Sequence, residues 1–131
     1  MTIKRFLMLS LLFLFTDYVY AEDVKLNGIS FGSVEQNGDV RLYGVVRGRF
    51  EPNGDLNVGG SINGRIDSDG SIRKGGRIIG RVAANGDVII DGVLKGKVED
   101  NGDVKEDGGI IGSARGIKKE QAAVIFFFKI F

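Results

Sequence analysis

The chain has 131 residues, 43% of them hydrophobic and 27% charged, which is enough for one small domain but not for two. It contains no cysteine and no histidine, which excludes disulfides and thiolate metal sites and removes the commonest general base. The 18 basic and 17 acidic residues nearly balance, which argues against nucleic acid or an anionic membrane as the main partner, although a local basic patch remains compatible with this balance.

Residues 1–21 predict a secretory signal peptide. Lys4 and Arg5 precede the mainly apolar run 6–15, and small residues follow at the expected cleavage site before Glu22. The alternative, an N-terminal membrane anchor, needs about 20 apolar residues, and this run is too short. Removal of Lys4, Arg5 and Asp17 leaves 16 basic and 16 acidic residues. We therefore expect an exported protein that is periplasmic, on the outer surface or extracellular.

A sixteen-residue repeat follows the leader and predicts a repeat architecture over residues 22–116. The pattern continues without a gap, from a half unit at 24–31 to a restart at 112–116. The five complete units are 32–47, 48–63, 64–79, 80–95 and 96–111. Every unit carries glycine at the same positions, so the glycines form columns when the units are aligned.

Two tight turns are predicted in each unit. A three-residue loop Gln36-Asn37-Gly38 pairs Val34 with Val40, and Pro52 fits the first position of the equivalent loop, because a type I turn needs a φ near −65° there. Glycine at the end of this loop is free to be left-handed, which gives a structural role to Gly54, Gly70, Gly86 and Gly102. A second three-residue loop is predicted at residues 42–44.

Alternation along the longer strand predicts the buried face. Val46, Gly48 and Phe50 share one face, and the same pattern recurs in the later units. Glycine inside a strand costs stability, so its repetition indicates close packing. The structural glycines of this column are Gly48, Gly64, Gly80 and Gly96. We predict an all-β fold in which five hairpins close into a pseudo-five-fold ring around these glycines, with the half unit completing the last hairpin. An open β-solenoid is the alternative.

The repeat and the tail resemble a known family. Units of the form G-[RK]-[VI]-x-x-[ND]-G-[DS]-[VI], followed by GSARGIKKEQAAVIFFF, resemble the bacterial five-fold beta-flower proteins over residues 24–128. The resemblance implies a ring of petals and an exported protein. It implies no activity and no functional residues, because the family has none assigned.

Residues 117–131 form a tail of different composition. Residues 118–123 favour helix, and residues 124–131 are apolar apart from Lys129. This run is too short for a transmembrane anchor, so we predict a plug that packs on the ring. Phe126, Phe127 and Phe128 cannot all face inward from one helical turn, and the alternative is that part of this apolar surface contacts a partner or membrane.

Two sets of polar residues are candidates for binding. The Asn-Gly-Asp turns offer oxygen ligands for calcium, but no twelve-residue calcium loop is present and turn chemistry explains the same residues, so no metal is predicted. The second set is a basic column opposite the apolar face, formed by Arg49, Arg65, Arg81 and Lys97. It predicts surface ion pairs with Glu51, Asp67 and Glu99 or, alternatively, a shallow anion or glycan site.

No catalytic set is found. The serines lack a histidine, and Asp67 with Asp69 is a weak candidate for a glycosidase pair. We therefore expect no enzyme activity and no cofactor. The predicted function is a structural or binding module of the bacterial cell envelope, whose partner is an envelope glycan or another envelope protein.

Overall fold

The computed structural model describes residues 21–131, so the predicted signal peptide lies almost entirely outside the described residues. Twelve strands are followed by a short α-helix, α2 (Lys119–Ala123), and a π-helical turn, η2 (Val124–Phe128). The strands are β1 (Glu22–Leu26), β2 (Ile29–Val34), β3 (Asp39–Leu42), β4 (Val45–Phe50), β5 (Asp55–Val58), β6 (Ser61–Ile66), β7 (Ser71–Lys74), β8 (Arg77–Val82), β9 (Asp87–Ile90), β10 (Val93–Val98), β11 (Asp103–Glu106) and β12 (Gly109–Ser113).

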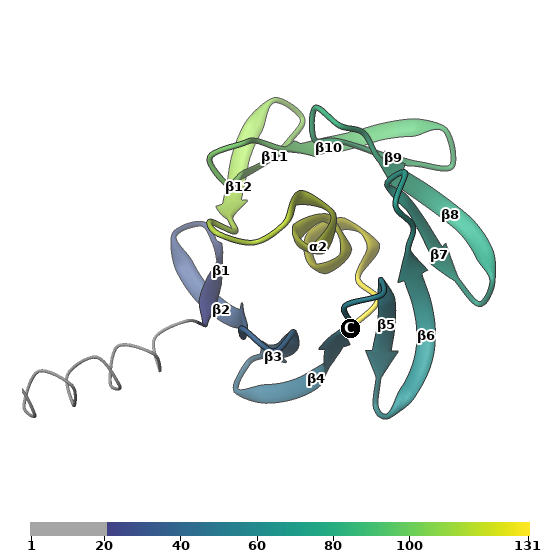
Figure 1. Cartoon of the computed structure of the whole chain (residues 1–131). Coiled ribbons are helices and arrows are strands. Elements are labelled where there is room, and N and C mark those ends of the chain that lie inside the picture. The colour runs from purple at the N-terminus through teal and green to yellow at the C-terminus, as the bar shows by residue number, and fades with distance from the viewer. Residues whose placement is uncertain (1–20) are drawn as a thin grey trace, which may run out of the picture.

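The strands form one closed antiparallel ring. Each strand pairs with its neighbours in the sequence, and β1 pairs with β12, with Lys25 opposite Ser113 and Leu26 opposite Gly112 (Figure 1). Among β1 to β12, closure leaves no free edge strand. The prediction of an all-β closed ring is confirmed, and the alternative of an open solenoid is wrong, because the two ends of the sheet meet.

The ring contains six hairpins, so the predicted count of five is not reproduced. Each complete unit supplies one hairpin, from β3–β4 to β11–β12. The half unit was expected to complete the last hairpin, but it forms a sixth, β1–β2. The physical reason is that residues 24–31 match the part of the unit that contains a hairpin turn and both flanking strands.

Two kinds of turn alternate around the ring. The inner turns, which connect successive hairpins, are residues 35–38, 51–54, 67–70, 83–86 and 99–102. Val34 pairs with Val40, and the amide of Gly38 donates to the carbonyl of Glu35 at 2.8 Å, which confirms the predicted three-residue loop. The tip turns, at the outer end of each hairpin, have two residues instead of the predicted three. Tyr43 and Gly44 both have positive φ, as a type I′ turn requires.

A bulge in every hairpin overturns the predicted buried face. Val40 pairs with Gly48 while Arg41 pairs with Val46, so Arg47 is an extra residue in β4. Val46 therefore shares a face with the exposed Arg41 rather than with the buried Phe50. The equivalent residues of the later hairpins are also exposed: Ile62, Ile78, Leu94 and Ile110.

The tail fills the interior of the ring. Helix α2 lies at the centre of the six hairpins in Figure 1, and Ala122, Ala123 and Val124 are fully buried. Around the tail, each of the six hairpins contributes valine, leucine, isoleucine or phenylalanine to one continuous core. Residues 117–131 thus lie inside the ring rather than across one mouth of it, and we call them the plug below.

Between residues 21 and 131, no helix combines the length and apolar character needed to cross a bilayer.

Candidate functional site

Glycines of the ring wall face the aromatic side chains of the plug. A Cβ atom built on Gly96 would lie 2.6 Å from Cε1 of Phe127, and one on Gly80 would lie 2.6 Å from Cε1 of Phe128. Gly48 faces Phe131 and Gly112 faces Phe126 in the same way. Because the plug is surrounded by the ring, consecutive phenylalanines meet different hairpins. Phe126 is buried, and Phe127 and Phe128 are half-buried.

Gly64 is the exception in this column. Its added Cβ would meet the carbonyl oxygen of Arg73, and the nearest side-chain atom is Cδ1 of Leu56 at 3.4 Å. The sequence suggested that these glycines meet one another at a common axis. This prediction is wrong, because each glycine faces a carbonyl group of the neighbouring strand instead. Their role is to let a neighbouring carbonyl, and at most positions an aromatic ring, come close to the backbone.

Two independent features require glycine in the inner turns: a positive φ and a lack of space for a Cβ atom. Gly54, Gly70, Gly86 and Gly102 have φ between 91° and 99°. A Cβ on Gly70 would also collide with the carbonyl oxygen of Val82, and one on Gly102 would lie 2.7 Å from Cα of Arg115. Conformation and space both require glycine at these positions.

The Asn-Gly-Asp residues of the inner turns hydrogen bond to each other. In the first such turn, the amide of Asp39 donates to Oδ1 of Asn37 at 3.0 Å, and Nδ2 of Asn37 donates to Oδ2 of Asp39 at 3.3 Å. The same pair of bonds recurs at residues 53–55, 85–87 and 101–103. These oxygens therefore stabilise turns. In the described part of the chain, no three potential ligand side chains are grouped to hold a metal ion.

The basic column lies on the outer wall, where most of its members have acidic partners. Arg49 binds Asp39 across the strands at 2.8 Å, and Arg65 binds Asp55 at 3.1 Å and Asp67 at 3.4 Å. Lys97 lies 3.6 Å from Glu99. Arg49 and Arg65 thus lie closest to cross-strand aspartates, which were not predicted as their partners. The ten-residue spacing between each aspartate and its arginine, which the hairpin register imposes, is the sequence feature that could have identified these pairs.

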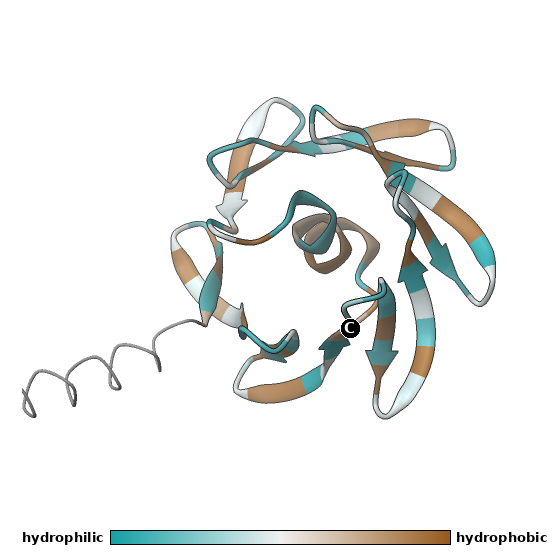
Figure 2. Ribbon diagram, in the orientation of Figure 1, coloured by the Kyte–Doolittle hydropathy of each residue, from teal (hydrophilic) through white to brown (hydrophobic). Residues whose placement is uncertain are grey.

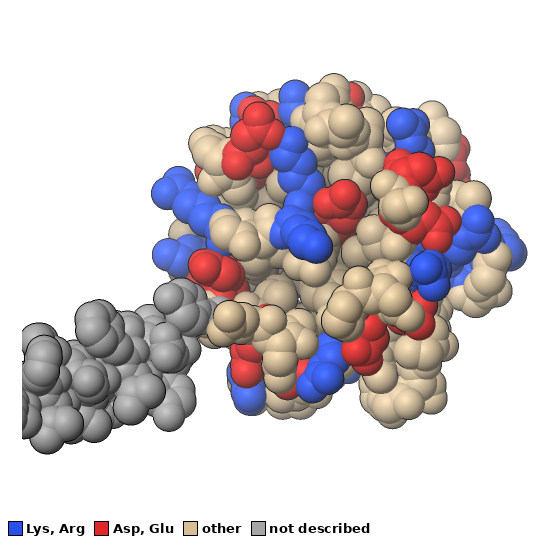
Figure 3. Space-filling view, in the orientation of Figure 1, with Lys and Arg blue, Asp and Glu red and all other residues tan. Residues whose placement is uncertain are grey.

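Arg81 differs from the other members of the column. Its cross-strand neighbour is Ser71, where the equivalent positions opposite Arg49 and Arg65 hold aspartate. The ion pairs found in residues 21–131 do not include Arg81, whose side chain is exposed. The column is therefore not uniform, and Figure 3 shows blue and red side chains interspersed around the centre of the ring.

Three carboxylates have pKa values that the fold lowers. The hydrogen bond from the backbone amide of Ser71 lowers the pKa of Asp69 below its ordinary value. The hydrogen bond from Arg49 lowers the pKa of Asp39 below its ordinary value. The hydrogen bond from Lys119 does the same for the pKa of Asp100. Lys119 also donates to the carbonyl of Ala84 at 3.4 Å, so it connects the start of α2 to two inner turns. These pairs hold the plug and the wall in place.

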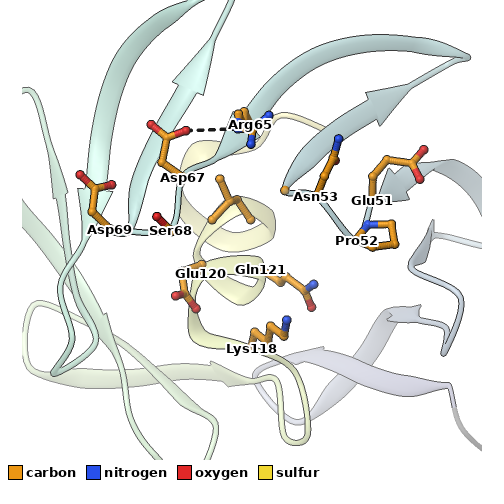
Figure 4. Close-up of a pocket in the computed structure, with 12 residues that line it drawn as sticks. Glu51, Pro52, Asn53, Arg65, Asp67, Ser68, Asp69, Lys118, Glu120 and Gln121 are labelled. Carbon is orange, nitrogen blue, oxygen red and sulfur yellow. Dashed lines mark ion pairs between the residues drawn. The ribbon is translucent and has the colours of Figure 1, made fainter.

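An open polar cleft of about 610 Å³ lies between the plug and two inner turns (Figure 4). Its labelled side chains include Glu51, Arg65, Asp67, Asp69 and Gln121. Asp67 binds both Arg65 and Arg73, and Oδ1 of Asp69 accepts from the amide of Ser71 at 2.9 Å. Asp67 and Asp69 therefore serve the wall and the turn. Arg65 is the one member of the basic column that lines this cleft.

A second cavity, of about 490 Å³, lies at the opposite end of the plug beside the tip turns. It is lined mainly by apolar side chains, including Leu26, Phe31, Ile125 and Phe126, with Lys129 among the polar ones. No motif in the sequence predicts this cavity. It lies between the plug and three hairpins, and local sequence patterns do not predict how segments so far apart in the chain pack together.

No family model, curated protein or solved structure matches this chain. The resemblance to the beta-flower proteins therefore stays a prediction from the residues, and the functional argument rests on the geometry of the chain itself.

Proposed function

We propose that this protein is a non-catalytic structural or binding module that is exported to the bacterial cell envelope. The observation that carries the proposal is that many of the polar side chains of the inner turns and of the polar cleft are engaged with one another. Asn37 with Asp39 and Asp67 with Arg73 are examples. Groups that stabilise turns and strand pairs suit a rigid scaffold better than an acid-base reaction, which needs a group positioned to exchange a proton with substrate.

Export is tested by expressing the full chain in bacteria and measuring its location and intact mass. We expect the chain in the periplasmic or extracellular fraction, with a mass that corresponds to residues 22–131. A control chain that lacks residues 1–21 should remain in the cytosol. Recovery of the uncut 131-residue chain from the cytosol would overturn the proposal of an exported module.

A second candidate function is binding of an anionic glycan at the basic column. The observation that favours it is the exposed Arg81, which faces Ser71 rather than an aspartate. An array of glycans and anionic polymers tests this function with the mature chain. Arg81→Ser should lower binding more than Arg49→Ser, because Arg49 already pairs with Asp39. Equal binding by both variants and the parent would contradict it.

A further inference from the structure

The six hairpin tips together form one end of the ring. Successive turns of an antiparallel ring lie at alternating ends, so all tip turns lie at one end and all inner turns at the other. We define the tip rim as the segments around these tip turns. The tip rim comprises residues 25–31, 41–47, 57–63, 73–79, 89–95 and 105–111.

The tip rim carries the exposed apolar surface of the described chain. All ten large hydrophobic residues that are exposed between residues 21 and 131 belong to it, and Tyr43, at 73% exposed, is the most accessible. The ten residues are Leu26, Ile29, Tyr43, Val45, Val46, Ile62, Ile78, Val93, Leu94 and Ile110. Figure 2 shows the corresponding brown segments on the outer parts of the hairpins. The bulges cause part of this exposure, because they turn Val46 and its equivalents outward.

The tip rim is also basic, whereas the rest of the ring is acidic. The rim has eight basic and three acidic residues, a net charge of +5. The remainder of residues 22–131 has eight basic and 13 acidic residues, a net charge of −5. Three rim cations, Arg41, Arg73 and Lys105, bind the acidic first residues of inner turns. The other five are exposed and take part in no ion pair of the described chain: Lys25, Arg47, Lys74, Arg77 and Lys95.

We propose that the tip rim docks on the surface of an anionic lipid bilayer. Aliphatic side chains such as Leu94 enter the interface, while neighbouring cations such as Lys95 contact lipid phosphates. Exposed apolar residues interspersed with lysine and arginine are the features of proteins that lie on membranes, and each cation near an anionic surface contributes about 1 kcal/mol. The apolar cavity beside Leu26 and Phe31 opens at the same end and enlarges the apolar surface.

Charge distinguishes the bilayer from other occupants of the tip rim. A second copy of the chain, joined rim to rim, would place two net charges of +5 against each other. Nucleic acid would neutralise the cations but leave the ten aliphatic and aromatic side chains without an apolar partner. An anionic bilayer satisfies both kinds of side chain. The inference rests on the proposed function, because export to the cell envelope would bring the chain to such a bilayer.

Sedimentation of the purified mature chain with lipid vesicles tests this inference. We expect binding to vesicles of phosphatidylcholine mixed with phosphatidylglycerol, and roughly tenfold weaker binding to pure phosphatidylcholine or in high salt. The double variant Arg77→Glu, Lys95→Glu should weaken binding at least roughly tenfold. The matched control Arg115→Glu, Lys118→Glu has the same net charge but alters exposed cations outside the tip rim, and it should bind as the parent does.

A second variant isolates the apolar contribution. Leu94→Asn with Ile110→Asn leaves the charge unchanged and alters side chains that are 62% and 60% exposed, so it should fold normally yet bind more weakly. Absence of vesicle binding by the parent, or equal loss in the rim and control charge variants, would overturn the inference. Concentration-dependent dimers in analytical ultracentrifugation that Leu94→Asn abolishes, without vesicle binding, would assign the rim to a second copy. If the chain binds vesicles but the export experiment finds it in the cytosol, the docking surface stands and only the proposed location is overturned.

Discussion

Gly96 shows how a missing side chain shapes this fold. Its Cα faces Phe127 and the carbonyl of Lys105, so Gly96→Ala forces the wall away from the plug. Overpacking of this kind costs about 1 to 3 kcal/mol, and we expect Gly96→Ala to lower the free energy of unfolding by that amount in denaturant titrations. Gly109→Ala is the control, because its nearest contact would be at 3.8 Å and its φ is not positive. Equal stability of the two variants would contradict the close packing.

Substitutions of Gly70 distinguish the cost of a positive φ from the cost of a collision at the Cβ position. Asparagine tolerates positive φ better than most residues, and the sequence alone therefore suggests that Gly70→Asn is mild. The carbonyl of Val82 occupies the position of a Cβ, so we expect Gly70→Asn and Gly70→Ala both to cost about 1 to 3 kcal/mol. Gly75→Asn should change the melting temperature little, since Gly75 has open space and the equivalent tip residue is Asn27. A mild Gly70→Asn would show that the turn relaxes.

Asp39 makes stability depend on pH. Because the hydrogen bond from Arg49 lowers the pKa of Asp39 in the folded state, the folded chain favours the carboxylate. The resulting stability is present above the unfolded pKa of about 3.9 and is lost as the pH falls through the lower folded value. We expect Asp39→Asn to reduce the acid-induced fall in Tm below about pH 4. An identical fall in Asp39→Asn and the parent would contradict this assignment.

At the scale of elements, the plug supplies part of the buried core. Phe126 is 8% exposed, and its ring packs edge-on against Phe31 with centroids 5.5 Å apart. We expect Phe126→Ala to lower the free energy of unfolding by about 3 to 5 kcal/mol in denaturant titrations. Tyr43→Ala, at a side chain that is 73% exposed, should change it by at most about 0.5 kcal/mol. Similar losses in both variants would mean that the plug is not part of the cooperative core.

The π-helical turn η2 distributes the phenylalanines of the plug. The amide of Lys129 donates to the carbonyl of Val124 at 2.7 Å, a five-residue step that makes this turn wider than an α-helical one. Phe126, Phe127 and Phe128 thereby meet the glycines of β12, β10 and β8, which belong to successive hairpins. The composition of the tail predicted a buried segment. The distribution of its side chains depends on the ring that surrounds it.

At the scale of the whole molecule, the β1–β12 contact is the point of closure. The other eleven neighbouring strand pairs are connected by a turn, whereas β1 and β12 are held by packing and by bonds such as the amide of Asn27 to the carbonyl of Ile111 at 2.9 Å. Local opening is therefore easiest here. In hydrogen-exchange mass spectrometry, we expect residues 22–26 to exchange before residues 55–58 of β5. Slower exchange in β1 than in β5 would contradict this order.

The sequence by itself determined the repeat, the closed all-β ring and the three-residue inner turns. Each follows from local features: a gapless period and turn residues with restricted φ. The tertiary structure alone decided the sixth hairpin, the exposed face of Val46, the positions of the aromatic rings over Gly80 and Gly96, and the separation of charge between the two ends. A bulge changes the face on which a residue lies, and no reliable local sequence pattern marks its position. A net charge near zero does not show how the strand register distributes the basic and acidic residues over the molecule.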